Sequence, residues 1–268
     1  MQRSILMQPR ASVAAAAFAL LLLAVTPSRA SGLNDTGQSA CSNAAGTMVP
    51  CGATAADGRY GRDAAAATQK LTKTGAGAAG FDFTKIANDG STLPESAQRG
   101  ANPGDWACTR DNVTGNVWET KTDDSLSVRY RGHRYTWYST AGNNGGNAGT
   151  AGSFASCNAT LGISTPCDTA HYIAAINAAA LCGYTNWRLP TMHELLSIVH
   201  YGAASPPLDL GYFQEPLYDP SSPFPGLWTG VTAAFDPSVA WNVRTDSGAP
   251  VTFFKAAQFN VYLVRSAP

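Results

Sequence analysis

After its first 30 residues the chain lacks an apolar run long enough to cross a bilayer, for which about 20 residues are needed. It also lacks an excess of positive charge. Arg3, Arg10 and Arg29 lie in the leading segment, and removing them leaves 15 basic residues against 18 acidic ones, a net charge near −3. That balance excludes a general polyanion-binding surface, though not a local one. We therefore expect no nucleic-acid partner and no membrane span beyond residue 30.

Motifs for several common chemistries are also missing. The chain has no Cys-x-x-Cys pair typical of a zinc site and no Gly-x-Ser-x-Gly elbow of a serine hydrolase. The segment TGAGAAG has neither the Lys-Ser/Thr ending nor the preceding apolar strand of a phosphate-binding loop. Asp111-Asn112 and Asp123-Asp124 offer oxygen ligands for calcium, but their spacing does not form an EF-hand. We expect no catalytic residue, no metal and no cofactor, so the chain should not be an enzyme.

Residues 1–30 predict an export signal. Two arginines precede the apolar run ASVAAAAFALLLLAV, and Ser-Arg-Ala, ending at Ala30, has small residues at the positions that a signal peptidase reads. The alternative is a retained membrane anchor, which the shortness of the run disfavours. We expect the mature chain in the periplasm, on the cell surface or secreted.

The cysteines agree with export. All six follow the predicted signal, and an even number in an oxidising compartment predicts disulfides. Fifteen connectivities exist for six cysteines. The ten-residue spacings favour two short loops and leave the remaining two cysteines to pair, which gives Cys41–Cys51, Cys157–Cys167 and Cys108–Cys182.

The composition and the apolar periodicity of the chain change near Trp106. Residues 31–105 are rich in Gly, Ala and Asn with little apolar periodicity, which predicts a loop-rich annex before the main domain at residues 106–268. In that domain Asp168 as N-cap and Gly183 as left-handed stop enclose one helical pattern. Alternating apolar residues predict strands in NVWETKT, SVRYRGHRYTWYS, VAWNVRT, VTFFK and NVYLVRS. The expected fold class is α+β.

The stretch RLPTMHELLSIVH predicts a second, well-capped helix. Pro190 ends an extended segment, Thr191 is placed as N-cap, and Glu194 three residues later completes a capping box. A zinc-binding reading fails because His193 and His200 stand seven residues apart, about 10.5 Å along a helix axis.

Several segments together resemble the Lcl C-terminal domain family over roughly residues 105–266: DNVTGNVWETKT, CDTAHYIAAINAAALCGYTNWRLPTMHELLSIV, a Trp228-Thr229 pair, AWNV and VYLVR. The block Trp187-Arg188-Leu189-Pro190-Thr191 is the most specific piece. The resemblance implies a C-type-lectin-like α+β domain with two helices and short antiparallel sheets, related to formylglycine-generating enzymes. It also implies an adhesin-like binding role, since the founding member binds sulfated polysaccharides.

The sequence departs from that family in ways that bear on function. Formylglycine-generating chemistry relies on a reactive cysteine pair late in the domain, and no cysteine follows Cys182. No collagen-like Gly-x-y repeat is present, so presentation on a triple helix is not implied. We assign Trp187 to the core, and expect Arg188 to bond to backbone carbonyls or to an acid such as Glu119.

The best local support for ligand binding is VRYRGHRY. On a strand, Arg129 and Arg131 would project from one face with His133 and Arg134 at its end, and paired guanidiniums bind sulfate or carboxylate. The alternative is a solvated strand edge protected by charge. We expect a non-catalytic module that binds an anionic polysaccharide or a cell-surface protein, with a structural or assembly role in the envelope as the alternative.

Overall fold

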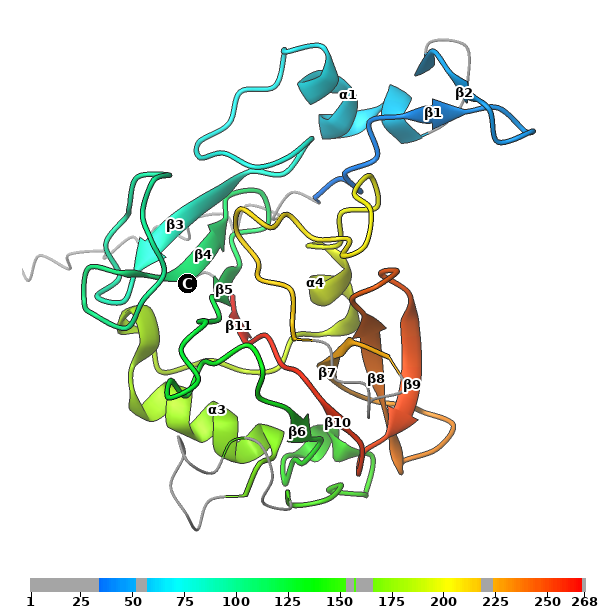
Figure 1. Ribbon diagram of the computed structural model, residues 1–268. Coiled ribbons are helices and arrows are strands. Elements are labelled where there is room, and N and C mark those ends of the chain that lie inside the picture. The colour runs from blue at the N-terminus through cyan, green and yellow to red at the C-terminus, as the bar shows by residue number, and fades with distance from the viewer. Residues whose placement is uncertain (1–33, 52–56, 153–156, 158–165, 218–223, 267–268) are drawn as a thin grey trace, which may run out of the picture. The chain divides into compact units, whose positions relative to one another are not determined.

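The computed structural model describes residues 34–51, 57–152, 157, 166–217 and 224–266, so the predicted export signal lies outside the described residues. These residues belong to one compact unit, Ser31–Pro268. They form helices and several small antiparallel sheets, and the expected α+β class is confirmed (Figure 1). No described helix has the length and apolarity needed to cross a membrane.

The central sheet has four antiparallel strands in the order β11-β5-β4-β3. They span Val264–Arg265 (β11), Val117–Glu119 (β5), Trp106–Asp111 (β4) and Phe83–Ala87 (β3). Nearly every residue of β3, β4 and β5 is buried, because both faces of the sheet are covered. Strand β3 comes from the segment predicted as a loop-rich annex, so residues on both sides of position 105 share one sheet.

A second sheet joins β7 (Gly226–Thr232), β8 (Val239–Arg244) and β9 (Pro250–Phe254), all antiparallel. The β8–β9 turn uses Gly248 at φ +72°, where an added Cβ would lie 2.5 Å from a Val199 methyl group. Two further pairs are short: β1 (Cys41–Ser42) with β2 (Met48–Val49), and β6 (Tyr135–Thr136) with β10 (Gln258–Phe259).

The α-helices in the described part of the chain are α1 (Gly61–Ala67), α3 (Thr169–Ala178) and α4 (Met192–Leu196). Single 3-10 turns cover Asp57–Arg59, Gly142–Asn144 and Leu181–Gly183. Asp168 caps α3 as predicted, with its carboxylate 2.9 Å from the His171 amide. The predicted stop at Gly183 is wrong, because the chain already enters left-handed backbone at Ala180, φ +48°.

All three expected disulfides are confirmed: Cys41–Cys51, Cys108–Cys182 and Cys157–Cys167. The Cys108–Cys182 bond joins β4 to the turn that follows α3, across a sequence separation of 74 residues. The other two close loops of 10 residues each.

A buried ion pair lies between the central sheet and α3. The Lys121 Nζ atom is 2.6 Å from a Glu119 carboxylate oxygen and 2.7 Å from the Tyr172 hydroxyl. The second Glu119 oxygen accepts from the Leu263 amide at 3.0 Å, so each carboxylate oxygen has a partner. Burial lowers the pKa of Lys121, and the Glu119 charge opposes that shift. Removing one member would leave a buried charge without its counter-ion.

Candidate functional site

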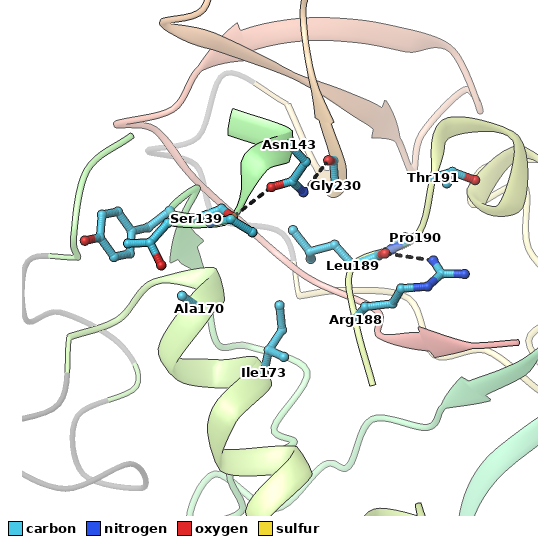
Figure 2. A pocket seen from close by; sticks show the side chains of 12 residues that line it. Ser139, Asn143, Ala170, Ile173, Arg188, Leu189, Pro190, Thr191 and Gly230 are labelled. Atoms are coloured by element: carbon cyan, nitrogen blue, oxygen red, sulfur yellow. Dashed lines mark hydrogen bonds between the residues drawn. The ribbon is translucent and has the colours of Figure 1, made fainter. Parts of the chain in front are cut away.

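A surface pocket of about 530 Å³ lies between α3, the segment before α4, the end of β7 and the turn after β6. Figure 2 shows its walls, with Ala170 and Ile173 of α3 on one side and Leu189 and Pro190 facing them. The residues that line it are Tyr138, Ser139, Thr140, Ala141, Asn143, Ala170, Ile173, Arg188, Leu189, Pro190, Thr191 and Gly230.

The wall formed by residues 188–191 is fixed to α3 through Trp187. The Trp187 side chain is buried, and its indole N–H donates to the Leu181 carbonyl at 3.1 Å. Asn177 holds the Trp187 backbone at both ends: it accepts from the amide at 2.8 Å and donates to the carbonyl at 3.0 Å. The core role predicted for Trp187 is confirmed, and this core residue also sets the position of the pocket wall.

The same wall is fixed to α4 through Arg188 and the cap of the helix. The Arg188 guanidinium donates to both Glu194 oxygens, at 2.8 and 2.7 Å, and to the Leu189 carbonyl at 3.1 Å. The predicted capping box is confirmed, since Thr191 accepts from the Glu194 amide while Glu194 accepts from the Thr191 amide. The acid that pairs with Arg188 is therefore Glu194 and not Glu119, which Lys121 occupies. Glu194 serves as both cap and counter-ion.

These contacts also set the ionisation of Glu194. Burial raises the pKa of its carboxyl, but hydrogen bonds from Arg188 and Thr191, with the charge of Arg188, outweigh burial and leave the pKa lowered. The Arg188 pKa is raised chiefly by the hydrogen bond to Glu194. The pair is fully charged at neutral pH.

Another wall is a turn formed by residues 139–143. Asn143 donates to the Gly230 carbonyl at 3.1 Å and accepts from the Ser139 hydroxyl at 2.9 Å (Figure 2). The base of this turn is held to α3, because Thr169 exchanges hydrogen bonds of 2.8 and 2.9 Å with the Tyr138 backbone. Residues 140–151 are rich in Gly, Ala and Asn, which is typical of a surface loop, and most of them are exposed. That the loop closes one side of a pocket was not visible in its composition.

The pocket lining is mainly apolar, with hydroxyl and amide groups at the rim. The charged side chain among its described lining residues is Arg188, which is already paired with Glu194. An apolar concave surface with a few polar groups is typical of small-ligand sites. This arrangement can hold an uncharged ligand that presents both an apolar face and hydroxyl groups.

The predicted arginine site is not assembled. Residues 127–134 form turns and not the expected strand, so Arg129 and Arg131 do not project from one strand face. Arg129 is only 4% exposed. Its guanidinium donates to the carbonyls of Gly100, Ala107 and Thr120 at 2.6, 3.2 and 2.5 Å. The assignment of Arg129 to ligand binding is therefore wrong, since it crosslinks three backbone segments inside the protein.

Arg131, His133 and Arg134, the other residues of that predicted site, lie in different environments and do not form one basic surface. Arg131 is partly exposed and pairs with Asp123 at 2.5 Å. His133 is buried, with its Nε2 atom 3.2 Å from the Ser127 carbonyl, and it is no surface ligand. Arg134 is half-buried and directly precedes β6. Alternation in the sequence suggested one basic face, but the tight turns at residues 127–132 remove it.

The calcium candidates weighed from sequence also have other partners. Both Asp111 oxygens accept hydrogen bonds from the turn that follows β4, including the Val113 amide at 2.9 Å. Asp123 accepts from Arg131 and from the Gln214 amide at 2.8 Å, while Asp124 caps a turn at the Leu126 amide.

Comparison with known protein families matches the Lcl C-terminal domain. The sequence model of the Lcl C-terminal domain covers residues 107–265. The chain belongs to the Lcl C-terminal domain family. This membership suggests an extracellular domain, and the three disulfides are compatible with export. No curated protein and no solved structure matches the chain.

Every pocket-lining residue falls inside the matched Lcl C-terminal domain. Strand β3 lies before the match, although it pairs with β4 along its whole length. The Lcl C-terminal domain of this chain therefore shares its central sheet with residues that precede the matched segment.

Proposed function

We propose that this chain is an exported, non-catalytic binding module that holds an uncharged saccharide unit in the pocket beside residues 188–191. The observation that carries the proposal is the pocket itself, with an apolar lining and a rim of hydroxyl and amide groups. Sugar rings offer apolar C–H faces and hydroxyls to such a surface. A volume of about 530 Å³ lies within the range of small-ligand sites.

The electrostatics favour a neutral saccharide over a sulfated one. Binding of sulfate calls for cations free to form charge-assisted hydrogen bonds. Arg188 is committed to Glu194, and Arg129 is buried. Arg131, the more exposed of the predicted pair, already contacts Asp123.

The lining also supports binding without chemistry. The ionisable side chains among the described lining residues are Tyr138 and Arg188. General acid–base catalysis calls for a group that loses and regains a proton near the working pH. The guanidinium is a poor candidate, because its hydrogen bond to Glu194 raises the pKa of Arg188 and holds it in the charged form.

The test is binding of the purified chain to an array of neutral and sulfated glycans at low and physiological salt. Ala170→Phe would fill the pocket from α3, and Ala178→Phe puts the same ring on an exposed position of that helix outside the pocket. Asn143→Ala removes a rim amide. We expect binding to neutral glycans with little salt dependence, reduced at least about tenfold by Ala170→Phe and unchanged by Ala178→Phe.

Other outcomes would contradict this proposal. Binding confined to sulfated glycans, suppressed by salt and by Arg131→Ala, would place the ligand on a charged surface. Equal binding by Ala170→Phe, Asn143→Ala and the parent chain would move the site away from the pocket. A failure to bind any glycan would favour a protein partner, to be sought by pull-down from envelope extract.

A further inference from the structure

Three carboxylates converge in the segment that precedes the Lcl C-terminal domain. Asp35, Asp57 and Asp63 each offer a carboxylate oxygen, and these oxygens lie within 4.8 Å of one another. They come from the chain before β1, from the 3-10 turn Asp57–Arg59 and from α1. Like charges at this separation repel, so the arrangement calls for a neutralising partner.

Asp63 is the most deeply buried of the three aspartates. Its side chain is 0% exposed. One oxygen, Oδ1, accepts from the Gly80 amide at 2.7 Å, whereas Oδ2 has no hydrogen-bond partner among the residues that the structure describes. A buried carboxylate oxygen without a partner is costly unless a cation or a proton meets it.

The backbone around the cluster is shaped to let the carboxylates approach. Gly61 has φ +69°, and an added Cβ would lie 2.3 Å from Asp35 Oδ2. A Cβ on Gly80 would lie 2.7 Å from Asp63 Oδ1. The Asp63 amide also donates to Asp35 Oδ2 at 2.9 Å, which fixes two of the three acids relative to each other.

The guanidinium of Arg62, next to Asp63 in the chain, makes its described contacts outside the cluster. Arg62 donates through Nε to the Gly80 carbonyl at 2.8 Å, and its Nη2 atom lies 3.8 Å from Asp82. Burial raises the pKa of the Asp63 carboxyl, and the charges of Asp35 and Asp57 raise it further, while the backbone amides of Gly80 and Gly37 lower it. The described cation with a recorded charge interaction with Asp63 is Lys73, whose Nζ atom donates to the carbonyls of Gly77 and Ala79.

We infer that Asp35, Asp57 and Asp63 form a binding site for a hard divalent cation, Ca²⁺. Calcium takes six to eight oxygen ligands at about 2.3–2.6 Å, so oxygens on opposite sides of the ion stand up to about 5 Å apart. The limit of 4.8 Å for the three carboxylates fits inside such a sphere. Magnesium, at about 2.0–2.1 Å, demands a tighter octahedral set. Asp57 is exposed, which leaves that side of the ion open to water ligands.

The site would fasten the start of the described chain to the main body. Thr36, next to Asp35, accepts from the Tyr201 amide at 2.9 Å, and Asn34 donates to the Ser197 carbonyl at 3.2 Å. An ion that ties Asp35 to α1 therefore stabilises contacts that reach the segment after α4. Binding to the folded state alone raises the midpoint of unfolding.

The test is calorimetric titration of the purified, chelator-treated chain with CaCl₂ alone, together with thermal unfolding in calcium or in EDTA. Asp57→Asn removes one charge at an exposed position of the cluster. Asp124→Asn makes the same change at an exposed aspartate outside it. We expect one site with a dissociation constant of about 10⁻⁴–10⁻³ M, the range of extracellular calcium modules. At roughly ten times that concentration the midpoint should rise by about 3–6 °C.

Asp57→Asn should weaken calcium binding at least about tenfold, and Asp124→Asn should leave it unchanged. No heat and no shift of the midpoint in millimolar calcium would overturn the inference, and Asp63 would then be neutralised by a proton. Equal affinity of Asp57→Asn and the parent chain would also overturn it, because the ion would lie elsewhere. Since the parent chain is titrated directly, the result does not depend on how well a variant folds.

Discussion

Replacement of Glu194 probes the structure most sharply, because this residue holds α4 and the pocket wall together. One carboxylate accepts from the Thr191 amide at 2.8 Å and receives two hydrogen bonds from Arg188. Glu194→Ala removes all three interactions. Glu194→Gln keeps an acceptor for the Thr191 amide, since Gln serves at this position of a capping box, but removes the negative charge.

The expected magnitudes follow from those contacts. A helix cap is worth about 1 kcal/mol. The Arg188 side chain is 42% exposed, so solvent screening limits the ion pair to about 0.5–1 kcal/mol. Glu194→Ala should then cost roughly 1.5–2 kcal/mol and lower the unfolding midpoint by about 3–8 °C. Glu194→Gln should cost only the ion-pair part, about 0.5–1 kcal/mol.

The pH dependence separates the two contributions. The folded-state pKa of Glu194 lies below its ordinary value of 4.5, so the charged form is favoured by folding. Its contribution is fully present above pH 4.5 and is lost as the pH falls through the lowered folded value. The stability gap between the parent chain and Glu194→Gln should therefore be constant from pH 7 to about pH 5 and should shrink below it.

Calorimetry or urea unfolding of the three proteins from pH 3 to 7 measures these quantities. If the difference in unfolding free energy between the parent chain and Glu194→Gln does not change with pH, the Arg188–Glu194 ion pair does not contribute to stability. Equal losses for Glu194→Ala and Glu194→Gln would refute the separate value of the cap.

Two other stability predictions follow from the core. Trp187→Ala should cost roughly 3–5 kcal/mol in urea unfolding, because it empties a buried site and removes the indole hydrogen bond to the Leu181 carbonyl, and a cost below about 1 kcal/mol would contradict its core role. Replacing Cys108 and Cys182 by alanine should cost about 4.5 kcal/mol on loop-closure entropy, against about 2.7 kcal/mol for Cys41 and Cys51, because the closed loops differ in length. Equal losses for the two disulfides would show that loop length does not control their effect.

The sequence predicted best those features whose residues lie close together in the chain, or for which only a few pairings are possible. The capping box at Thr191 and Glu194 depends on three-residue spacing, and the Asp168 cap on the same rule. The disulfides followed from cysteine spacing within an even set. In each case the residues that decide the structure stand close in sequence or are few enough to enumerate.

The features that the sequence did not predict depend on contacts between residues that are distant in the chain. Arg129 and Arg131 alternate as on a strand, but the Arg129 guanidinium finds carbonyls as far away as Gly100, which no local pattern records. Strand β3 was hidden because both of its faces are buried, so FTKIA shows no alternation of polar and apolar residues. The Asp35, Asp57 and Asp63 cluster joins residues up to 28 positions apart and has no fixed spacing that a motif could specify.

Two walls of the pocket differ in how firmly they are held. Residues 187–191 are fixed by contacts with several elements, whereas the turn at residues 139–143 has few contacts. Residues 187–191 contact α3 through Asn177, α4 through Glu194, β7 through the Gly230 amide, and β11 through paired backbone bonds with Val264. The facing turn at residues 139–143 is mostly exposed, and its Asn143 side chain reaches one carbonyl of β7. Substitutions at exposed positions usually change stability by less than about 0.5 kcal/mol. Substitutions in the turn should therefore cost little stability, whereas a change in residues 187–191 disturbs four elements at once.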